Sequence, residues 1–126
     1  MEKSQLPLLL LDNASMSTVL NDGEFKISSL SFVEAKAIVE MYEESEVLRC
    51  FSGDPLEQIV FDYLGVQGWH YPFKTITDMR AGQDAIVFKV LATFSETQPV
   101  IETKYNTEAK KIQNLYVYCQ YITRLA

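Results

Sequence analysis

The feature that most constrains the fold is a short, unbroken apolar run near the start of the chain, "PLLLL", Pro7 to Leu11. A helix that crosses a membrane needs about 18 or more apolar residues, so this run is too short to be one. It also lacks the apolar core and the small-residue cleavage site of a secretory signal peptide. We therefore predict a buried first strand, in a cytoplasmic protein that has no membrane partner.

The size and the charge of the chain limit its organisation and its partners. It has 126 residues, which suit one domain covering 1–126, and 48% of them are hydrophobic and 22% charged, as in globular proteins. The formal net charge of −6 argues against duplex nucleic acid as a partner, because such binding needs clustered Lys and Arg. A small anionic ligand is still allowed, since one local pocket can oppose the net charge.

Cysteine and histidine usage indicates neither a metal site nor a cofactor. Cys50 and Cys119 lie far apart, each within an apolar run, which is typical of buried thiols in a reducing compartment. His70 is the single histidine, and with two cysteines it has no zinc-ligand spacing. No Ser-His-Asp set or nucleotide-binding glycine loop appears, so the residues alone assign no catalytic group.

Two helices have clear start signals. Ser31 and Glu34 have the spacing of a capping box, which predicts a helix over "SFVEAKAIVEMY". In "GDPLEQ", Asp54 is a predicted helix cap and Pro55 occupies the first helical position, where its missing amide costs nothing. Gly65 is predicted to end this second helix.

The remaining segments predict an α/β or α+β domain with a single mixed β-sheet of about five to six strands flanked by helices. "DNASMSTVL" after the first strand favours a short helical turn, and "MRAGQ" favours a hairpin turn between two strands. The further predicted strands are Phe25–Ser29, Glu46–Phe51, Phe73–Asp78, Asp84–Phe94 and Leu115–Thr123, and a further helix is predicted around Thr107–Gln113.

The turn Ser52–Asp54, between an apolar strand and a helix, has two interpretations. It is either a helix cap, or a ligand site in which exposed amides bind a phosphate and Gly53 permits close backbone approach. The carboxylates of Asp54 and Glu57 count against a phosphate. Asn13 and Ser15, after the first strand, count in favour as polar groups suited to a ribose, base or phosphate.

Two aromatic groups have a structural and a functional interpretation each. The tyrosines of "LYVYCQYIT" fit a packed sheet strand or a pairing surface. "GWHYPF" could be structural, or it could stack on an adenine or anchor a protein partner. The candidate interface residues in this second group are Trp69, His70, Tyr71 and Phe73.

Three motifs together resemble the viral ring nucleases, anti-CRISPR enzymes of a small archaeal-virus and phage family that cleave cyclic tetra-adenylate. "DNASMS" is similar to the family's "NAFS" after its first strand, and places Asn13 on the family asparagine. "FSGDPLEQIVFDYLG" resembles the family's strand-to-helix turn, and "AGQDAIVFKVLATFSET" its later turn and strand. The resemblance covers most of the chain and implies a homodimer with a ligand site across its two-fold axis.

Departures from the family pattern fall on the residues that carry its chemistry. The position of the catalytic histidine falls at Ser52 or Gly53, and that of the arginine near Thr93. The position of the family serine falls at Met16, with Ser15 and Ser17 on either side. Glu96 matches the family glutamate, but a lone carboxylate faces a phosphate unfavourably.

These departures favour binding over catalysis. The resemblance predicts a phage or viral anti-defence protein that binds a cyclic oligonucleotide or related signal without efficient cleavage, through Asn13, Ser15, Ser17, Ser52, Gly53 and Glu96. A first alternative is an acidic inhibitor that binds a host defence protein directly. A second is a ring nuclease with a rebuilt site that uses Glu96 or His70.

Overall fold

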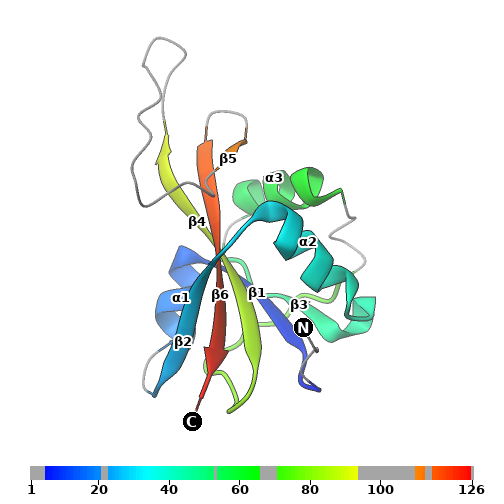
Figure 1. The fold of residues 1–126 in the computed structure, drawn as a ribbon, viewed down its shortest axis with the longest axis vertical. Coiled ribbons are helices and arrows are strands. Elements are labelled where there is room, and N and C mark those ends of the chain that lie inside the picture. Colours follow the sequence, from blue (N-terminus) through cyan, green and yellow to red (C-terminus); the bar gives the residue numbers. More distant parts are fainter. Residues whose placement is uncertain are drawn as a thin grey trace.

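A computed structural model of the chain describes residues 5–20, 23–52, 54–65, 71–93, 110–112 and 115–125. In chain order the elements are β1 (Leu8–Asp12), α1 (Asn13–Val19), β2 (Phe25–Leu30), α2 (Phe32–Glu40), the 3-10 helix η1 (Glu44–Glu46), β3 (Val47–Arg49), α3 (Asp54–Leu64), β4 (Asp84–Thr93), β5 (Lys110–Ile112) and β6 (Leu115–Arg124). The strands form one mixed sheet flanked by helices (Figure 1). The predicted fold class is confirmed.

The sheet combines a parallel part with an antiparallel part. Its strand order is β2-β6-β4-β1-β3, and β5 pairs with β6. β1 runs parallel to both of its neighbours, β3 and β4, whereas β6 runs antiparallel to β4, β2 and β5. A parallel strand with a neighbour on each side is usually covered on both faces, which accounts for the apolar run that forms β1.

The side chains of β1 divide between two hydrophobic cores, one on each face of the sheet. Leu8 and Leu10 join a core with residues of α2 and α3, and we call this side the α2/α3 face. Leu9 and Leu11 join a second core with Val19 of α1, on what we call the α1 face. All four leucines are 0% exposed, so β1 is the centre of the packing.

The capping box of α2 and the glycine end of α3 are confirmed, whereas α3 begins one residue earlier than predicted, with Asp54 as its first residue and Pro55 as its second. The Ser31 hydroxyl accepts from the Glu34 amide at 3.1 Å, and the Glu34 carboxylate accepts from the Ser31 amide at 3.1 Å. This is the predicted capping box of α2. Gly65 follows α3 with φ +72°, a left-handed conformation that favours glycine and ends the helix as predicted.

The predicted strand Phe73–Asp78 and its hairpin are wrong. A single parallel bridge joins Phe73 to Arg49, and the chain then crosses the α1 face before β4 begins. Ile76 and Met79 pack into the core on that face, and Met79 is 2% exposed. The apolar residues of this segment therefore cover the sheet instead of pairing within it.

The predicted helix over Thr107–Gln113 is also wrong for the residues that the structure describes there. Lys110–Ile112 form β5, which pairs antiparallel with the start of β6. Helix propensity differs by less than about 1 kcal/mol per residue between ordinary side chains, so pairing with an existing strand overrides it.

Both cysteines are buried thiols, as predicted, and neither forms a disulfide. Cys50 lies in the core on the α1 face and Cys119 in the core on the α2/α3 face, so the sheet separates them. Burial raises the pKa of the Cys50 thiol to about 12. None of the described helices has the length and apolar content needed to cross a membrane.

Candidate functional site

A buried carboxylate joins two chain segments at the carboxyl end of β1. Asp12, the last residue of β1, is 7% exposed. Its Oδ1 accepts from the Ser15 amide at 2.8 Å and from the Ser15 hydroxyl at 2.7 Å. Its Oδ2 accepts from the Ser52 amide at 2.9 Å and from the Ser52 hydroxyl at 2.7 Å. We call Asp12, Ser15 and Ser52 the Asp12 clamp.

Local sequence forms one half of the Asp12 clamp and strand pairing forms the other. Asp12 caps α1, and Ser15, three residues on, returns the contact by accepting from the Asp12 amide at 3.0 Å. Ser52 lies close to Asp12 because it follows β3, the parallel neighbour of β1, with Leu10 opposite Arg49. The two strands therefore leave the sheet at the same edge, 40 residues apart in sequence.

The clamp lies where open α/β sheets usually hold ligands. The chain leaves β1 into α1, which packs on one face of the sheet, and leaves β3 toward α3, which packs on the other. Neighbouring parallel strands whose exits go to opposite faces open a crevice at their carboxyl ends. The candidate site is therefore supported by topology as well as by its polar side chains.

The Asp12 carboxylate is held in its ionised form. Burial alone would raise the pKa of Asp12, but the hydrogen bonds from Ser52 and Ser15 together outweigh burial and lower it below its usual value. An ionised carboxyl group only accepts hydrogen bonds, and both oxygens are already engaged. At neutral pH Asp12 can neither donate a proton nor readily take one, so it is suited to positioning other groups.

The remaining predicted ligand residues lie around the clamp or outside the described chain. Asn13 and Ser17 are exposed on α1, and the Ser17 hydroxyl donates to the Ala14 carbonyl at 2.8 Å. The Ser52 side chain is also exposed, whereas that of Ser15 is half-buried. Strand pairing thus brings Ser15 and Ser52 together at one carboxylate. Gly53 and Glu96 lie outside the described residues.

Glu57 has a different role from the one the sequence suggested. It was expected to oppose a phosphate at the start of α3, but it is 9% exposed and forms an ion pair with Arg49 of β3. Arg49 Nε also donates to the Tyr71 carbonyl at 2.7 Å. The charge of Glu57 is therefore offset by Arg49, and among the described side chains of the clamp Asp12 supplies the negative charge.

The described part of the aromatic group divides between core and surface. Tyr71 is 8% exposed and stacks on Phe61 of α3, with ring centroids 5.8 Å apart. Phe73 is 58% exposed. Trp69 and His70 lie outside the described residues. Of the candidate interface residues described, Phe73 is the one with an exposed ring.

Sequence reasoning named Ser15 and Ser52 but missed Asp12, which connects them. A signal for half of its role was present, because an Asp followed three residues later by a Ser has capping-box spacing. The contact with Ser52 had no local signal, since it depends on which strands become neighbours.

Comparisons with known proteins assign no family to the chain. No protein-family model matches it, and no curated protein matches it in sequence. Within the described ranges, no group of three or more His, Cys, Asp and Glu side chains could hold a metal ion.

The lowered pKa of Asp12 predicts a pH-dependent contribution to stability. A carboxyl group with a lower pKa in the folded state stabilises the fold above its unfolded pKa, and this contribution disappears as the pH falls through the folded pKa. The parent should therefore exceed Asp12→Asn in free energy of unfolding near neutral pH, and the gap should narrow below about pH 4. Denaturant unfolding of both proteins at several pH values measures this difference in free energy. A difference that widens in acid would contradict a lowered pKa for Asp12.

Proposed function

We propose that this chain binds a cyclic oligonucleotide or a related nucleotide signal at the carboxyl ends of β1 and β3, without efficient cleavage, and thereby counters an antiviral defence. The ligand class comes from the resemblance to the viral ring nucleases. The observation that carries the location is the Asp12 clamp, which fixes Ser52 on the residue that precedes the exposed Asn13, at the edge where such sheets hold ligands.

The chemistry of the clamp supports binding without cleavage. Phosphodiester cleavage benefits from a general acid or base whose pKa lies near the working pH, and from a cation at the scissile phosphate. Asp12 is the titratable group at the described part of the site, and its pKa is shifted away from neutrality. Its hydrogen bonds come from the uncharged donors Ser15 and Ser52.

We also propose a homodimer, and the outer edge of β2 supports it. The Leu125 amide donates to the Glu24 carbonyl at 2.8 Å, so Glu24 turns its backbone groups toward β6. Backbone groups of successive strand residues point to alternate sides. The N–H and C=O groups of Phe25, Ile27 and Ser29 therefore point away from β6. Among the described residues, β2 pairs with β6 alone, and the Ile27 side chain is 51% exposed. Such an edge suits pairing with a second strand.

Calorimetric titration with cyclic tetra-adenylate tests the proposed function. We expect saturable binding at about one ring per chain, because β6 and β4 lie between β2 and β1 and keep the two clamps of a β2-joined dimer apart, and we expect intact rings on chromatography afterwards. Asn13→Ala should weaken binding by about tenfold, because it removes one or two hydrogen bonds. Ser45→Ala, at an exposed serine of η1 before β3, should bind like the parent.

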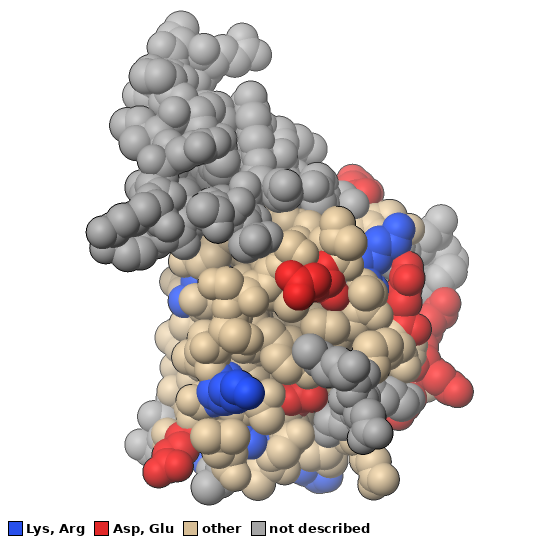
Figure 2. All heavy atoms as spheres, viewed as in Figure 1, with Lys and Arg blue, Asp and Glu red and all other residues tan. Residues whose placement is uncertain are grey.

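The outcomes of this titration separate the three functions. Cleaved rings would favour a rebuilt nuclease site. A complete lack of binding would remove the nucleotide function and favour a direct inhibitor of a host protein. For that second candidate, Figure 2 shows acidic side chains along the margin where α2 ends, and the exposed glutamates of that stretch include Glu40, Glu43 and Glu44. They contribute to the net charge of −6 and would complement a basic surface on a partner.

A further inference from the structure

We infer that the Asp12 clamp recognises a hydrogen-bond donor on the ligand, either a ribose hydroxyl or a nucleobase amino group, and turns phosphate oxygens away. This inference rests on the proposed function, because it specifies which part of the nucleotide faces Ser52. It reverses the expectation that the amides of the Ser52–Asp54 turn hold a phosphate.

The hydrogen bonds of Ser52 determine what it can offer a ligand. A serine hydroxyl has one proton to donate and two lone pairs. The proton of Ser52 goes to Asp12 Oδ2 at 2.7 Å, and the Ser52 amide goes to the same oxygen at 2.9 Å. Both donors of this residue are therefore used within the protein. Since the side chain is exposed, the lone pairs of Oγ are what a ligand meets.

Within the clamp, Ser52 is the serine whose hydroxyl oxygen is open to accept a hydrogen bond from a ligand. Ser15 Oγ donates to Asp12 Oδ1 at 2.7 Å and accepts from the Asp12 amide at 3.0 Å, so its proton and one lone pair are engaged, and the residue is half-buried. Ser17 Oγ uses its proton on the Ala14 carbonyl at 2.8 Å. Around the clamp, Ser17 and Ser52 thus offer oxygens to a ligand. Asn13 is the exposed neighbour whose amide can both donate and accept.

The charge behind Ser52 favours the same choice. Asp12 is 7% exposed and ionised, so its negative charge is poorly screened by water and repels a phosphate placed at Ser52. The short bond from Ser52 Oγ to the carboxylate also polarises the hydroxyl, which makes its oxygen a stronger acceptor. Charge and hydrogen-bond direction therefore select a donor group in the ligand.

Ring analogues and a serine variant test the inference together. The probes are cyclic tetra-adenylate, the same ring without its 2′-hydroxyls, and the ring with inosine in place of adenosine, which lacks the 6-amino group. Ser52→Ala should weaken binding of cyclic tetra-adenylate by about tenfold, and one analogue should bind both proteins with equal, weakened affinity. That analogue identifies the donor that Ser52 accepts. Ser52→Thr keeps a hydroxyl and should restore most of the affinity.

Each result decides one point. If no ring binds the parent, the proposed function fails and the inference falls with it. If cyclic tetra-adenylate binds but Ser52→Ala loses the same factor with all three rings, the nucleotide function stands and the inference is overturned. Competition by millimolar inorganic phosphate that disappears in Ser52→Ala would also overturn it, because Ser52 would then be binding the anion. Circular dichroism of both variants checks that a lost affinity is not a lost fold.

Discussion

Asp12→Ala is expected to lower the free energy of unfolding by about 3 kcal/mol, because a buried carboxylate that joins two segments is lost. Four hydrogen bonds disappear, and the amides of Ser15 and Ser52 lose their acceptor. The change removes both the cap of α1 and the contact between the exits of β1 and β3. Chemical denaturation followed by far-ultraviolet circular dichroism measures the loss.

Ser31→Ala is the matched control for this loss. Ser31 caps α2 through the same kind of capping box, but the contacts of this cap are exposed and lie within one turn of helix. Its removal should cost about 1 kcal/mol, as is typical for an N-cap. If Asp12→Ala costs no more than Ser31→Ala, the contact with Ser52 does not contribute to stability.

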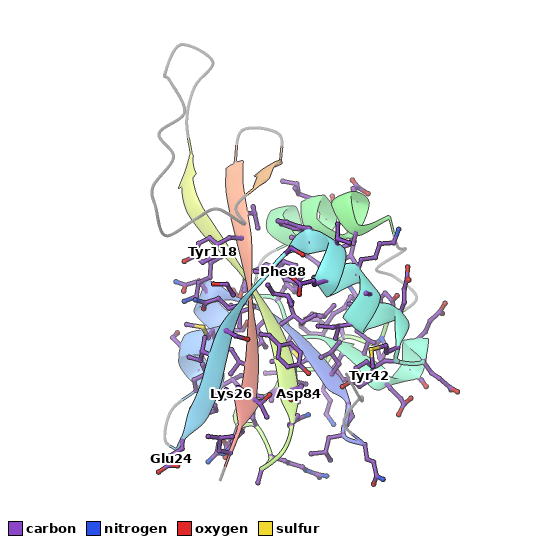
Figure 3. All side chains as sticks on the ribbon, in the orientation of Figure 1. Glu24, Lys26, Tyr42, Asp84, Phe88 and Tyr118 are labelled. Carbon is purple, nitrogen blue, oxygen red and sulfur yellow. The ribbon has the colours of Figure 1, made fainter. Side chains whose placement is uncertain are left out.

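Phe88→Ala should lower the free energy of unfolding by about 4 kcal/mol, the cost of emptying a phenylalanine site in a closed core. Phe88 lies on β4, on the face of the sheet that α2 and α3 cover (Figure 3). Its ring is 0% exposed and stacks on Phe51 at 5.8 Å between centroids, with Phe32 at 6.3 Å. Neighbours held by a sheet and two helices cannot close such a cavity completely.

Val33→Ala provides the comparison for an apolar residue outside the core. Val33 is 80% exposed on α2, where alanine is also the better helix former, so stability should change by less than about 0.5 kcal/mol. The same unfolding measurement applies to both variants. A cost below about 1.5 kcal/mol for Phe88→Ala would mean that this core is not packed as described.

Local signals in the sequence were sufficient for much of the fold. The capping box at Ser31 needs contacts only within one turn of helix, and Gly65 needs only its own backbone freedom, so both could be located by spacing. The run Leu8–Leu11 could be assigned to a buried strand because it is too short to span a membrane and too apolar to face water, and all four leucines are 0% exposed. Each of these features is decided by residues close together in the chain.

Features that depend on distant pairing could not be predicted in the same way. Phe73–Asp78 is rich in aromatic and β-branched residues, as strands are, yet its place beside β3 leaves it covering a face of the sheet. Lys110–Ile112 form a strand because β6 is available to pair. At the candidate site, Ser15 and Ser52 were named for their separate motifs, and only the parallel pairing of β1 with β3 places both on Asp12.

The two outer margins of the sheet also differ in what they allow. At the β3 margin, Pro72 and Lys74 bond to the backbone of Arg49, and the amide of Val47 donates to the Glu44 carbonyl of η1, so these outward groups of β3 are not open to a further strand. The β2 margin has no such cover among the described residues. A sheet that accepts a further strand at one edge alone cannot build a chain of copies by edge-to-edge pairing. Two copies joined at β2 would use up both open margins, so strand addition would end at a closed pair instead of a filament.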